Sequence, residues 1–291
     1  MNYLFFYYGK IPDYVLLTLN NILNIDKNAE LYLATQQKVK FKNVNIFDIS
    51  ETNLGDKFEE INEGFVEKNL VINPLWVTSM LRIFALKELK GYFNLDSFVH
   101  FDLDVLIYKS FEEIREKYKF PTNKVSITQN DPRNLVFGYS YFPNHNSIDG
   151  LVAKLNKNMS DIKKLQNLYS RGKEIPEMRH LGILNEMYPD MFNFLPSLPY
   201  ENTELLFDPA AYGQFLNGTH LKRGNYIFKR RWVSMNHLVG HELKSKRIKF
   251  KFNSKPFVIY DKKNIELANL HIHSKNISKY LPARQINYIN L

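Results

Sequence analysis

Apolar and polar positions alternate along the first third of the chain in blocks that predict strands and helices. Residues 3–8 are a continuous apolar run that ends at a glycine, which is typical of a buried parallel strand. Asp13 then opens a stretch with apolar residues at helical spacing, and its side chain is placed to cap that helix. Two more apolar runs follow at 31–34 and 44–49. This order of elements predicts the beginning of an α/β sheet.

The rest of the chain continues this pattern less regularly. After Pro74, apolar residues recur at helical spacing as far as Leu89, and the apolar segment 97–106 is predicted as a strand. Acidic residues after Ser110 mark the start of another helix. Further elements are predicted as strands at 125–127, 136–142 and 267–273, and as helices at 146–156, near Lys163 and at 177–187.

Two carboxylates stand within the predicted strand 97–106. Asp102 and Asp104 are two positions apart, and residues i and i+2 of an extended segment point to the same side. Two close carboxylates repel each other unless a cation or a proton lies between them. Apolar residues on both sides of the pair favour partial burial over a solvated turn. The pair therefore predicts a site for Mg²⁺ or Mn²⁺, whose remaining positions phosphate oxygens can fill.

Residues elsewhere in the chain offer related chemistry. Arg82 lies on the predicted helix before the pair, either on its exposed face or directed at a phosphate or a carboxylate. His271 and His273 are also two positions apart, and imidazole is an acceptable third ligand for Mn²⁺. Lys275 follows them and can neutralise a pyrophosphate. The spacing leaves both histidines as candidate metal ligands.

Composition excludes several classes of protein. The chain has 291 residues, of which 44% are hydrophobic, an ordinary globular composition that argues against general disorder. The absence of cysteine excludes disulfides, thiolate metal sites and a cysteine nucleophile, and suits a reducing compartment. No apolar run reaches the roughly 18 residues that span a bilayer, and residues 1–8 lack the features of a signal peptide. We therefore expect a cytoplasmic protein.

The positive charge is concentrated in one segment. The net charge of the chain is +9, and 13 lysine or arginine residues lie between 221 and 263, where only Glu242 and Asp261 oppose them. Such a segment is either a solvated basic face or a surface that meets anionic lipid headgroups or an anionic acceptor. The second interpretation predicts peripheral contact of 221–263 with the inner face of a membrane. No nucleic-acid recognition motif accompanies the charge, so we expect no nucleic-acid partner.

Taken together, these residues resemble the metal-dependent glycosyltransferases of the GT-A fold, especially the glycogenin and lipopolysaccharide-galactosyltransferase group called family 8. The likeness lies in the Tyr7-Tyr8-Gly9 end of the first strand, in Arg82, and in the segments 101–106 and 270–275. The resemblance implies an α/β fold with a Rossmann-like central mixed sheet flanked by helices, in a single domain over 1–291. It implies a nucleotide-binding half over 1–110. It also implies an acceptor and sugar-binding half over 111–291, less regular and ending in the metal-ligand strand.

The resemblance also implies an activity. It implies transfer of a sugar from a nucleotide sugar, a UDP-sugar, to a hydroxyl of a glycan or lipid-linked acceptor during surface polysaccharide biosynthesis. Mn²⁺ or Mg²⁺ would be the cofactor. The implied metal ligands are Asp102, Asp104, His271 and His273. The implied nucleotide contacts are Tyr7, Tyr8, Gly9, Asp48, Arg82 and Lys275.

The segment 207–220 is a candidate sugar-binding region. It gathers small, amide and carboxylate residues among aromatic ones, and sugar binding needs both hydrogen bonds and flat apolar faces. Asp208 and Gln214 are therefore candidates for donor-sugar contacts or for a catalytic base. The alternative is a turn followed by a helix on which Gln214 is merely solvated.

Two other functions are compatible with the same residues. Phosphatases of the haloacid-dehalogenase type also use Asp-x-Asp at a strand end, but normally on the first strand, whereas about a hundred residues precede the pair here. A non-catalytic module that binds a sugar nucleotide or a glycan would keep the site without turnover. Metal-dependent turnover of a nucleotide sugar separates the transferase from both.

Overall fold

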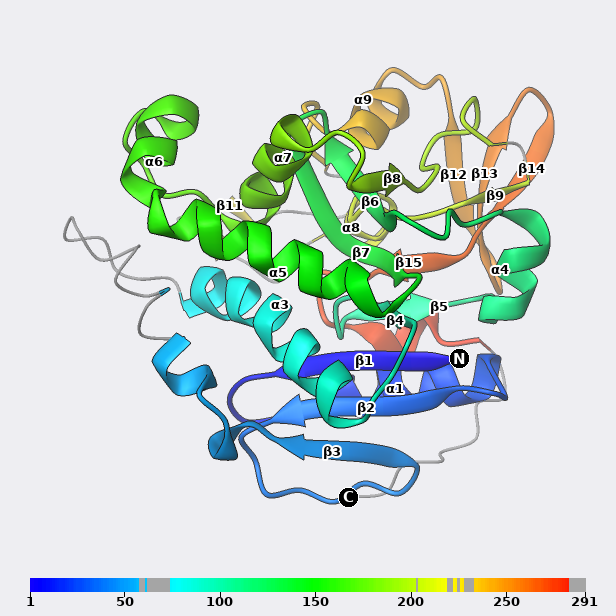
Figure 1. Ribbon diagram of the computed structural model, residues 1–291. Helices are drawn as coiled ribbons and strands as arrows, with labels where there is room; N and C mark the ends of the chain where they lie inside the picture. The colour runs from blue at the N-terminus through cyan, green and yellow to red at the C-terminus, as the bar shows by residue number, and fades with distance from the viewer. Residues whose placement is uncertain are drawn as a thin grey trace.

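The computed structural model describes residues 1–57, 61, 74–202, 204–218, 222–223, 226–227 and 233–282. A mixed sheet of seven strands forms the centre of the protein (Figure 1). In spatial order, its strands are β3 (Val44–Asp48), β2 (Glu30–Thr35), β1 (Asn2–Tyr7), β4 (Phe98–His100), β7 (Asn134–Phe142), β6 (Val125–Asp131) and β8 (Phe192–Phe194). The strands β3, β2, β1 and β4 run parallel, β7 is antiparallel to both β4 and β6, and β6 and β8 are parallel.

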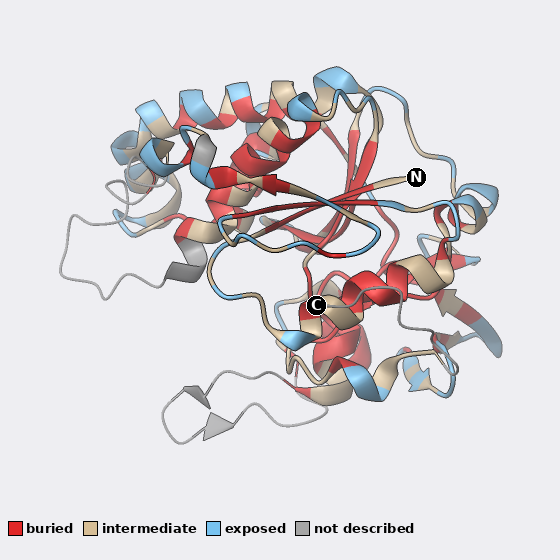
Figure 2. Ribbon diagram, turned by 90° about the horizontal axis from the view of Figure 1, so that it is seen from below, coloured by how far each residue is buried: buried red, intermediate tan, exposed pale blue. Residues whose placement is uncertain are grey.

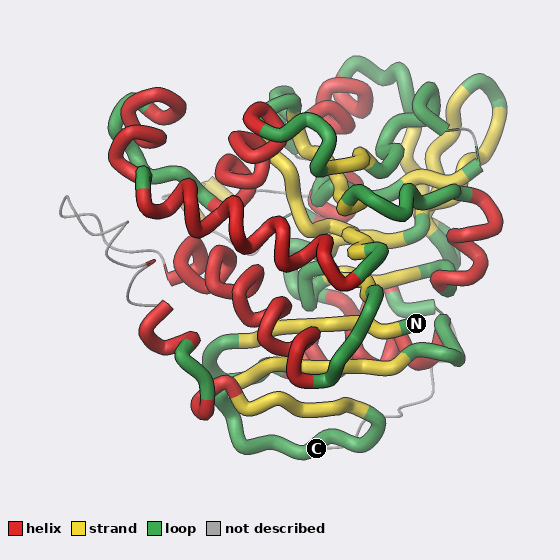
Figure 3. The backbone as a smooth tube through the Cα atoms, viewed as in Figure 1, coloured by secondary structure: helices red, strands yellow, loops and turns green. Residues whose placement is uncertain are grey.

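Helices cover both faces of this sheet. Alternate residues of β1 point to opposite faces, so Leu4 belongs to one apolar cluster and Phe5 to the other. The first face packs against α3 (Pro74–Tyr92), α5 (His145–Ser160) and α7 (Glu177–Met187). The second face packs against α1 (Asp13–Ile25) and α4 (Phe111–Lys117), and α6 (Ile162–Ser170) follows α5. Figure 3 shows the strands as a layer between helices, and Figure 2 shows that the buried residues concentrate along the strands.

A second, smaller unit of structure packs beside the sheet. A four-stranded sheet contains, in spatial order, β12 (Lys249–Phe252), β13 (Pro256–Tyr260), β14 (Lys263–Leu267) and β9 (Leu205–Leu206). The strand β15 (Asn269–His271) pairs antiparallel with β5 (Val105–Ile107). The remaining elements are α8 (Tyr212–Asn217), α9 (Leu238–Lys244), the hairpin of β10 (Lys222–Arg223) and β11 (Tyr226–Ile227), and the short helices η1 (Ile49–Glu51) and η2 (Ile277–Tyr280).

The predicted fold class is confirmed, since the protein has a central mixed sheet flanked by helices. The predicted strands of the first third and the predicted long helices are present within a few residues of their expected ends. No helix in the described part of the chain is both long enough and apolar enough to span a bilayer. Part of the basic segment 221–263, including 228–232, lies outside the described residues.

Three local predictions are wrong. The segment 97–106 is not one strand, because β4 ends at His100 and β5 begins only at Val105. Asp13 does not cap α1, since Pro12 occupies the N-cap position and Asp13 is the first helical residue. The last predicted strand also ends early, because β15 stops at His271.

A buried asparagine side chain fixes the strand that follows the carboxylate pair. β5 has β15 on one side, and on its other side Asn21 of α1 takes the place of a neighbouring strand. The Asn21 side chain accepts a 2.8 Å hydrogen bond from the Ile107 amide and donates a 3.2 Å bond to the Ile107 carbonyl oxygen. Asn21 is fully buried, so these backbone groups have no access to replacement water.

We expect Asn21→Ala to lower the free energy of unfolding by about 2 kcal/mol, because it leaves buried backbone groups of Ile107 without partners. Urea denaturation followed by circular dichroism measures this change. The control is Asn167→Ala at an exposed position of α6, which should change the free energy by less than about 0.5 kcal/mol. Equal effects of the two substitutions would show that the Asn21 side chain does not hold β5.

Candidate functional site

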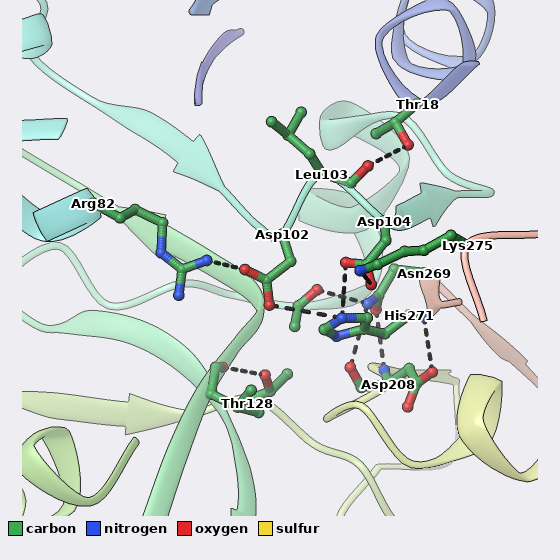
Figure 4. A network of polar contacts seen from close by, with 12 residues as sticks. Thr18, Arg82, Asp102, Leu103, Asp104, Thr128, Asp208, Asn269, His271 and Lys275 are labelled. Carbon is green, nitrogen blue, oxygen red and sulfur yellow. Dashed lines mark hydrogen bonds and ion pairs between the residues drawn. The ribbon is translucent and has the colours of Figure 1, made fainter. Parts of the chain in front are cut away.

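The two carboxylates lie in a turn between β4 and β5. Hydrogen bonds with β7 and α1 hold this turn from two sides. The Val105 amide donates to the Asp102 carbonyl oxygen at 3.0 Å, which closes the turn. The Asp102 amide donates to Phe137 of β7 at 3.0 Å. From α1, the Thr18 hydroxyl donates to the Leu103 carbonyl oxygen at 2.8 Å (Figure 4). The turn directs the two side chains to different partners. The extended strand predicted from the sequence would instead have placed them side by side.

Asp104 is buried and lies between two cationic or hydrogen-bonding side chains. Its Oδ1 atom lies 2.9 Å from Nε2 of His271, and its Oδ2 atom contacts Nζ of Lys275. The Ile272 amide donates to the Asp104 carbonyl oxygen at 2.8 Å, which joins the turn to the segment carrying the histidines. Burial alone would raise the pKa of Asp104, but the charges of His271 and Lys275 outweigh it and hold this pKa well below its usual range.

Asp102 forms the second half of the site with Arg82. A guanidinium nitrogen of Arg82 contacts Asp102 Oδ1, and the other terminal nitrogen lies 2.8 Å from Glu177 Oε1. The second carboxylate oxygen of Asp102 lies 3.7 Å from Nε2 of His271. Both aspartates therefore approach one imidazole, while Arg82 of α3 holds Asp102 from the opposite direction (Figure 4).

Glu177 is a site residue that the sequence did not reveal. It opens α7, where an acidic residue is ordinarily explained by the helix dipole, so its sequence position gives no signal of a special role. In the structure it is buried and shares Arg82 with Asp102. Burial raises the pKa of Glu177, although the adjacent Arg82 charge acts in the opposite direction.

The two histidines stack on each other at the end of β15. Their ring centroids are 4.2 Å apart and their planes are inclined by 5°. Burial, followed by the neighbouring His271, lowers the pKa of His273 to about 3, so this ring is neutral near pH 7. A hydrogen bond to the backbone of Ala210 orients the His273 ring. A neutral, oriented imidazole is the form that binds a metal ion.

Asp208 organises the backbone around these histidines. It is completely buried, and its carboxylate accepts hydrogen bonds from the amides of Ala211, Tyr212, Gly213 and His271, at 2.7 to 3.0 Å. Burial raises the pKa of Asp208, and the bonds from the backbone amides partly offset this rise. A carboxylate enclosed by four backbone donors positions its neighbours, and the predicted role of Asp208 as a donor-sugar contact or a catalytic base remains a prediction. Gln214, the other candidate, lies on α8 and is mostly buried, and its predicted sugar contact remains a prediction.

One glycine permits the close approach between α8 and β15. A Cβ atom built on Gly213 would lie 2.1 Å from the carbonyl oxygen of His271, closer than any side chain can come to a backbone atom. Gly213 also donates its amide to Asp208 at 2.8 Å. The position of His271 therefore depends on the absence of a side chain at 213.

The predicted nucleotide contacts occupy the sheet edge next to this site. Because β1, β3 and β4 run parallel, Tyr7, Asp48 and the Asp102 turn follow the same edge of the sheet, where ligands bind in open α/β folds. Tyr14, which the sequence analysis did not single out, connects them: its hydroxyl group is hydrogen-bonded to Tyr7, and its ring centroid lies 5.3 Å from Lys275 Nζ.

The other predicted nucleotide contacts are less directly connected to the carboxylates. Asp48 bonds locally to Ser50, which lowers the pKa of Asp48, and these bonds cap η1. Tyr8 is 42% exposed, and Gly9 has a positive φ of 98° that makes the turn after β1. Their contacts with a nucleotide remain predictions, as does that of Asp48.

A metal ion fits the donor set in this part of the structure. Asp104, His271 and His273 each offer one ligand atom, and these atoms lie within 4.8 Å of one another. The Nδ1 atom of His271 is buried and has no hydrogen-bond partner among the described residues. Carboxylate oxygen and neutral imidazole nitrogen are the donors that divalent first-row metal ions accept.

Comparison with known proteins gives distant structural likenesses. Neither a protein-family profile nor a curated protein matches the chain. Mouse xyloside xylosyltransferase 1 in its apo form is similar with a TM-score of 0.48 and 13% identity, covering 67% of this chain and 86% of that chain. The galactosyltransferase LgtC, in complex with donor and acceptor sugar analogues, is similar with a TM-score of 0.43 and 12% identity, covering 67% and 73%. With TM-scores below 0.5, these likenesses do not establish a family, and the function has to be inferred from the site's own residues.

We expect Gly213→Ala to lower the free energy of unfolding by about 1–3 kcal/mol, because the added methyl group forces β15 and α8 apart. Gly91→Ala on α3 is the matched control, since a Cβ atom there meets nothing within 4 Å. The control should leave stability unchanged or raise it by up to about 1 kcal/mol. Chemical denaturation measures both, and a neutral Gly213→Ala substitution would contradict the close approach to His271.

Proposed function

We propose that the protein is a glycosyltransferase of the GT-A type that moves a sugar from a UDP-sugar to a hydroxyl of a glycan or lipid-linked acceptor. The observation that carries this proposal is the convergence of the Asp102 turn with His271, His273 and Lys275 at one edge of the sheet. Asp104 and the two imidazoles can hold a divalent ion, and Arg82 and Lys275 supply the fixed positive charge that a diphosphate needs. The resemblance of the same residues to family 8 supports the same reaction.

The residues around the site have separable roles in this reaction. A divalent ion bound there would neutralise the charge that develops on the departing nucleoside diphosphate. Lys275 contacts Asp104 in the structure and can turn to a phosphate oxygen, because 30% of its side chain is exposed. Arg82 is held in place by both Asp102 and Glu177, so its charge is oriented before the substrate binds. Tyr14 connects Lys275 to Tyr7 at the nucleotide end of the sheet.

A contact to the donor sugar is proposed from the neighbouring helix. Gln214 on α8 lies six residues beyond Asp208 and remains our candidate for a contact to the donor sugar. Asp208 serves the reaction by holding the His271 backbone and the first turn of α8 in place.

We expect Asp104→Asn to reduce Mn²⁺-dependent hydrolysis of UDP-sugars by roughly 100-fold or more, because it weakens the binding of the ion and the ion pair with Lys275. A panel of UDP-sugars, with release of UDP as the readout, makes the measurement without knowledge of the acceptor. Asp190→Asn is the control, since this carboxylate is 99% exposed and pairs only with Lys124 among the described residues.

Each alternative function predicts a different result in the same experiment. A binding module would bind UDP without turnover in the unmodified protein. A haloacid-dehalogenase-type phosphatase would release phosphate from simple phosphomonoesters and would need no nucleotide. Either result, or unchanged UDP release by Asp104→Asn, would overturn the transferase proposal.

We also propose that the protein acts in the cytoplasm, with its basic segment against the inner face of an anionic membrane. Lys249 and Lys251 alternate along β12 and are both exposed, so they lie on one outward face of the small sheet. A lysine near an anionic bilayer surface contributes about 1 kcal/mol to binding.

Charge reversal at Lys249 and Lys251 should weaken binding to anionic vesicles by about tenfold or more, and added salt should weaken the unmodified protein similarly. Flotation with anionic and zwitterionic vesicles measures this binding. Charge reversal at the exposed Lys163 and Lys164 of α6 is the control. If vesicle binding is absent, or both variants weaken it equally, the membrane contact is wrong.

A further inference from the structure

A hollow with a volume of about 650 Å³ lies where the end of α3 meets the start of α5. We call it the α3–α5 hollow. Ligand pockets in proteins usually measure about 300–1,000 Å³, so its size is that of a binding site. Its walls come from the part of α3 between residues 87 and 92, from His145 and Asp149 of α5, from residues 52–53 after η1, and from Phe47 of β3. Both helices pack on the same face of the large sheet (Figure 1).

One wall of the α3–α5 hollow carries an exposed aromatic ring whose orientation is fixed. Tyr92, the last residue of α3, is 69% exposed. Its ring centroid lies 4.9 Å from those of Phe47 and Phe93, and the ring planes are inclined by 45° and 80°. These two neighbours orient the tyrosine ring and leave most of it uncovered. Such a ring loses little freedom on binding and offers a flat apolar surface to a ligand.

The charges around the α3–α5 hollow are balanced. The side chain of Lys90 is 3% exposed, and its Nζ atom lies 2.8 Å from Asp149 Oδ2 and donates to the His145 carbonyl oxygen at 3.0 Å. Lys87 and Glu88 add one further charge of each sign. An anionic ligand would meet the two carboxylates, and a cationic ligand would meet the two lysines. The lining therefore favours an uncharged ligand with polar groups.

Polar side chains in the α3–α5 hollow can bond to hydroxyl groups. Lys90 holds the Asp149 carboxylate in place, and 35% of the Asp149 side chain is exposed, so the carboxylate can accept further hydrogen bonds. The His145 side chain is 57% exposed, and its Nε2 atom lies 3.9 Å from Asp149. Asn53 adds an exposed amide from the segment after η1. Hydrogen-bonding groups beside a flat apolar surface are what sugar binding requires.

We propose that the α3–α5 hollow is an accessory site for an uncharged glycan chain, with a sugar ring on Tyr92 and hydroxyl groups bonded to Asp149 and His145. Lys90 lies eight residues beyond Arg82 on α3, roughly 12 Å along the helix axis, so the hollow is separate from the candidate transfer site. The glycan bound there is the part of an acceptor that lies away from the reacting end. Only this identity as an acceptor rests on the proposed function, since binding in the hollow needs neither nucleotide nor metal ion.

Native gel electrophoresis measures this binding, because a soluble glycan cast into the gel retards a protein that binds it. The probes are an α-glucan, a β-glucan, a galactan and a mannan, with dextran sulfate as an anionic comparison, and no nucleotide or metal ion is added. We expect at least one uncharged glycan to retard the protein. Tyr92→Ala should weaken this binding by about tenfold. Tyr200→Ala is the matched control, because its ring is 60% exposed but lies outside the hollow.

A second pair of variants tests the hollow by filling it. A Cβ atom at Gly91 meets nothing within 4 Å, so Gly91→Leu places a side chain in the hollow without strain. We expect this variant to weaken glycan binding by about tenfold or more while its melting temperature is unchanged or higher, which a loss of structure cannot explain. Gly150→Leu on α5 is the control. Gly150 lines a different hollow, of about 510 Å³, and its Cβ would lie 3.9 Å from Lys154 Nζ.

The inference is overturned if no uncharged glycan retards the protein, if Gly91→Leu binds normally, or if either control weakens binding as much as its partner variant. Retardation by dextran sulfate alone would also overturn it, because the basic segment then accounts for the binding. Glycan binding that Gly91→Leu removes, without UDP release from any UDP-sugar, would keep the accessory site and refute the transferase. UDP release without glycan binding would keep the transferase and refute the accessory site.

Discussion

The site depends on the pairing of two short strands that are far apart in the sequence. In the ladder of β5 and β15, Val105 lies opposite His271, so the turn that ends at Asp104 and the end of β15 meet in register. The Ile272 amide extends the pairing by donating to the Asp104 carbonyl oxygen at 2.8 Å. Neither strand belongs to the large sheet, and each is fixed by a buried polar side chain: Asn21 supports β5, and Asp208 supports the end of β15. These polar contacts therefore determine where the candidate site lies.

Burial of Asp104 and partial burial of Asp102 explain the cations around them. A buried carboxylate loses its hydration, and only close positive charge or hydrogen bonds can replace it. For Asp104, the replacements are His271 and Lys275, while for Asp102 the replacement is Arg82. Asp104, His271 and His273 would hold a metal ion in such a site, and Lys275 could then turn from Asp104 toward phosphate oxygens. The charges of the site are thus compensated in a way that still suits ligand binding.

Much of the fold and of the site was predictable from the sequence, because both produce local patterns. Buried parallel strands are continuous apolar runs, and paired carboxylates or histidines between such runs are conspicuous. The turn at Asp102 was not predictable, because its apolar neighbours favour one continuous strand. Glu177 and Tyr14 were missed for a related reason: an acidic first turn and an aromatic on an amphipathic helix are ordinary features. The role of Asp208 depends on the amide of His271, a partner that no local pattern reveals.

The central claim is that Asp104 and the two imidazoles hold an ion that binds the diphosphate of a sugar donor. A crystal structure with UDP and Mn²⁺, with data collected for the anomalous signal of manganese, tests it most directly. We predict one anomalous peak within bonding distance of Asp104, His271 and His273, with diphosphate oxygens completing the coordination and Lys275 moved from Asp104 to a phosphate. A manganese peak away from Asp104, or UDP bound at another edge of the sheet, would contradict the account.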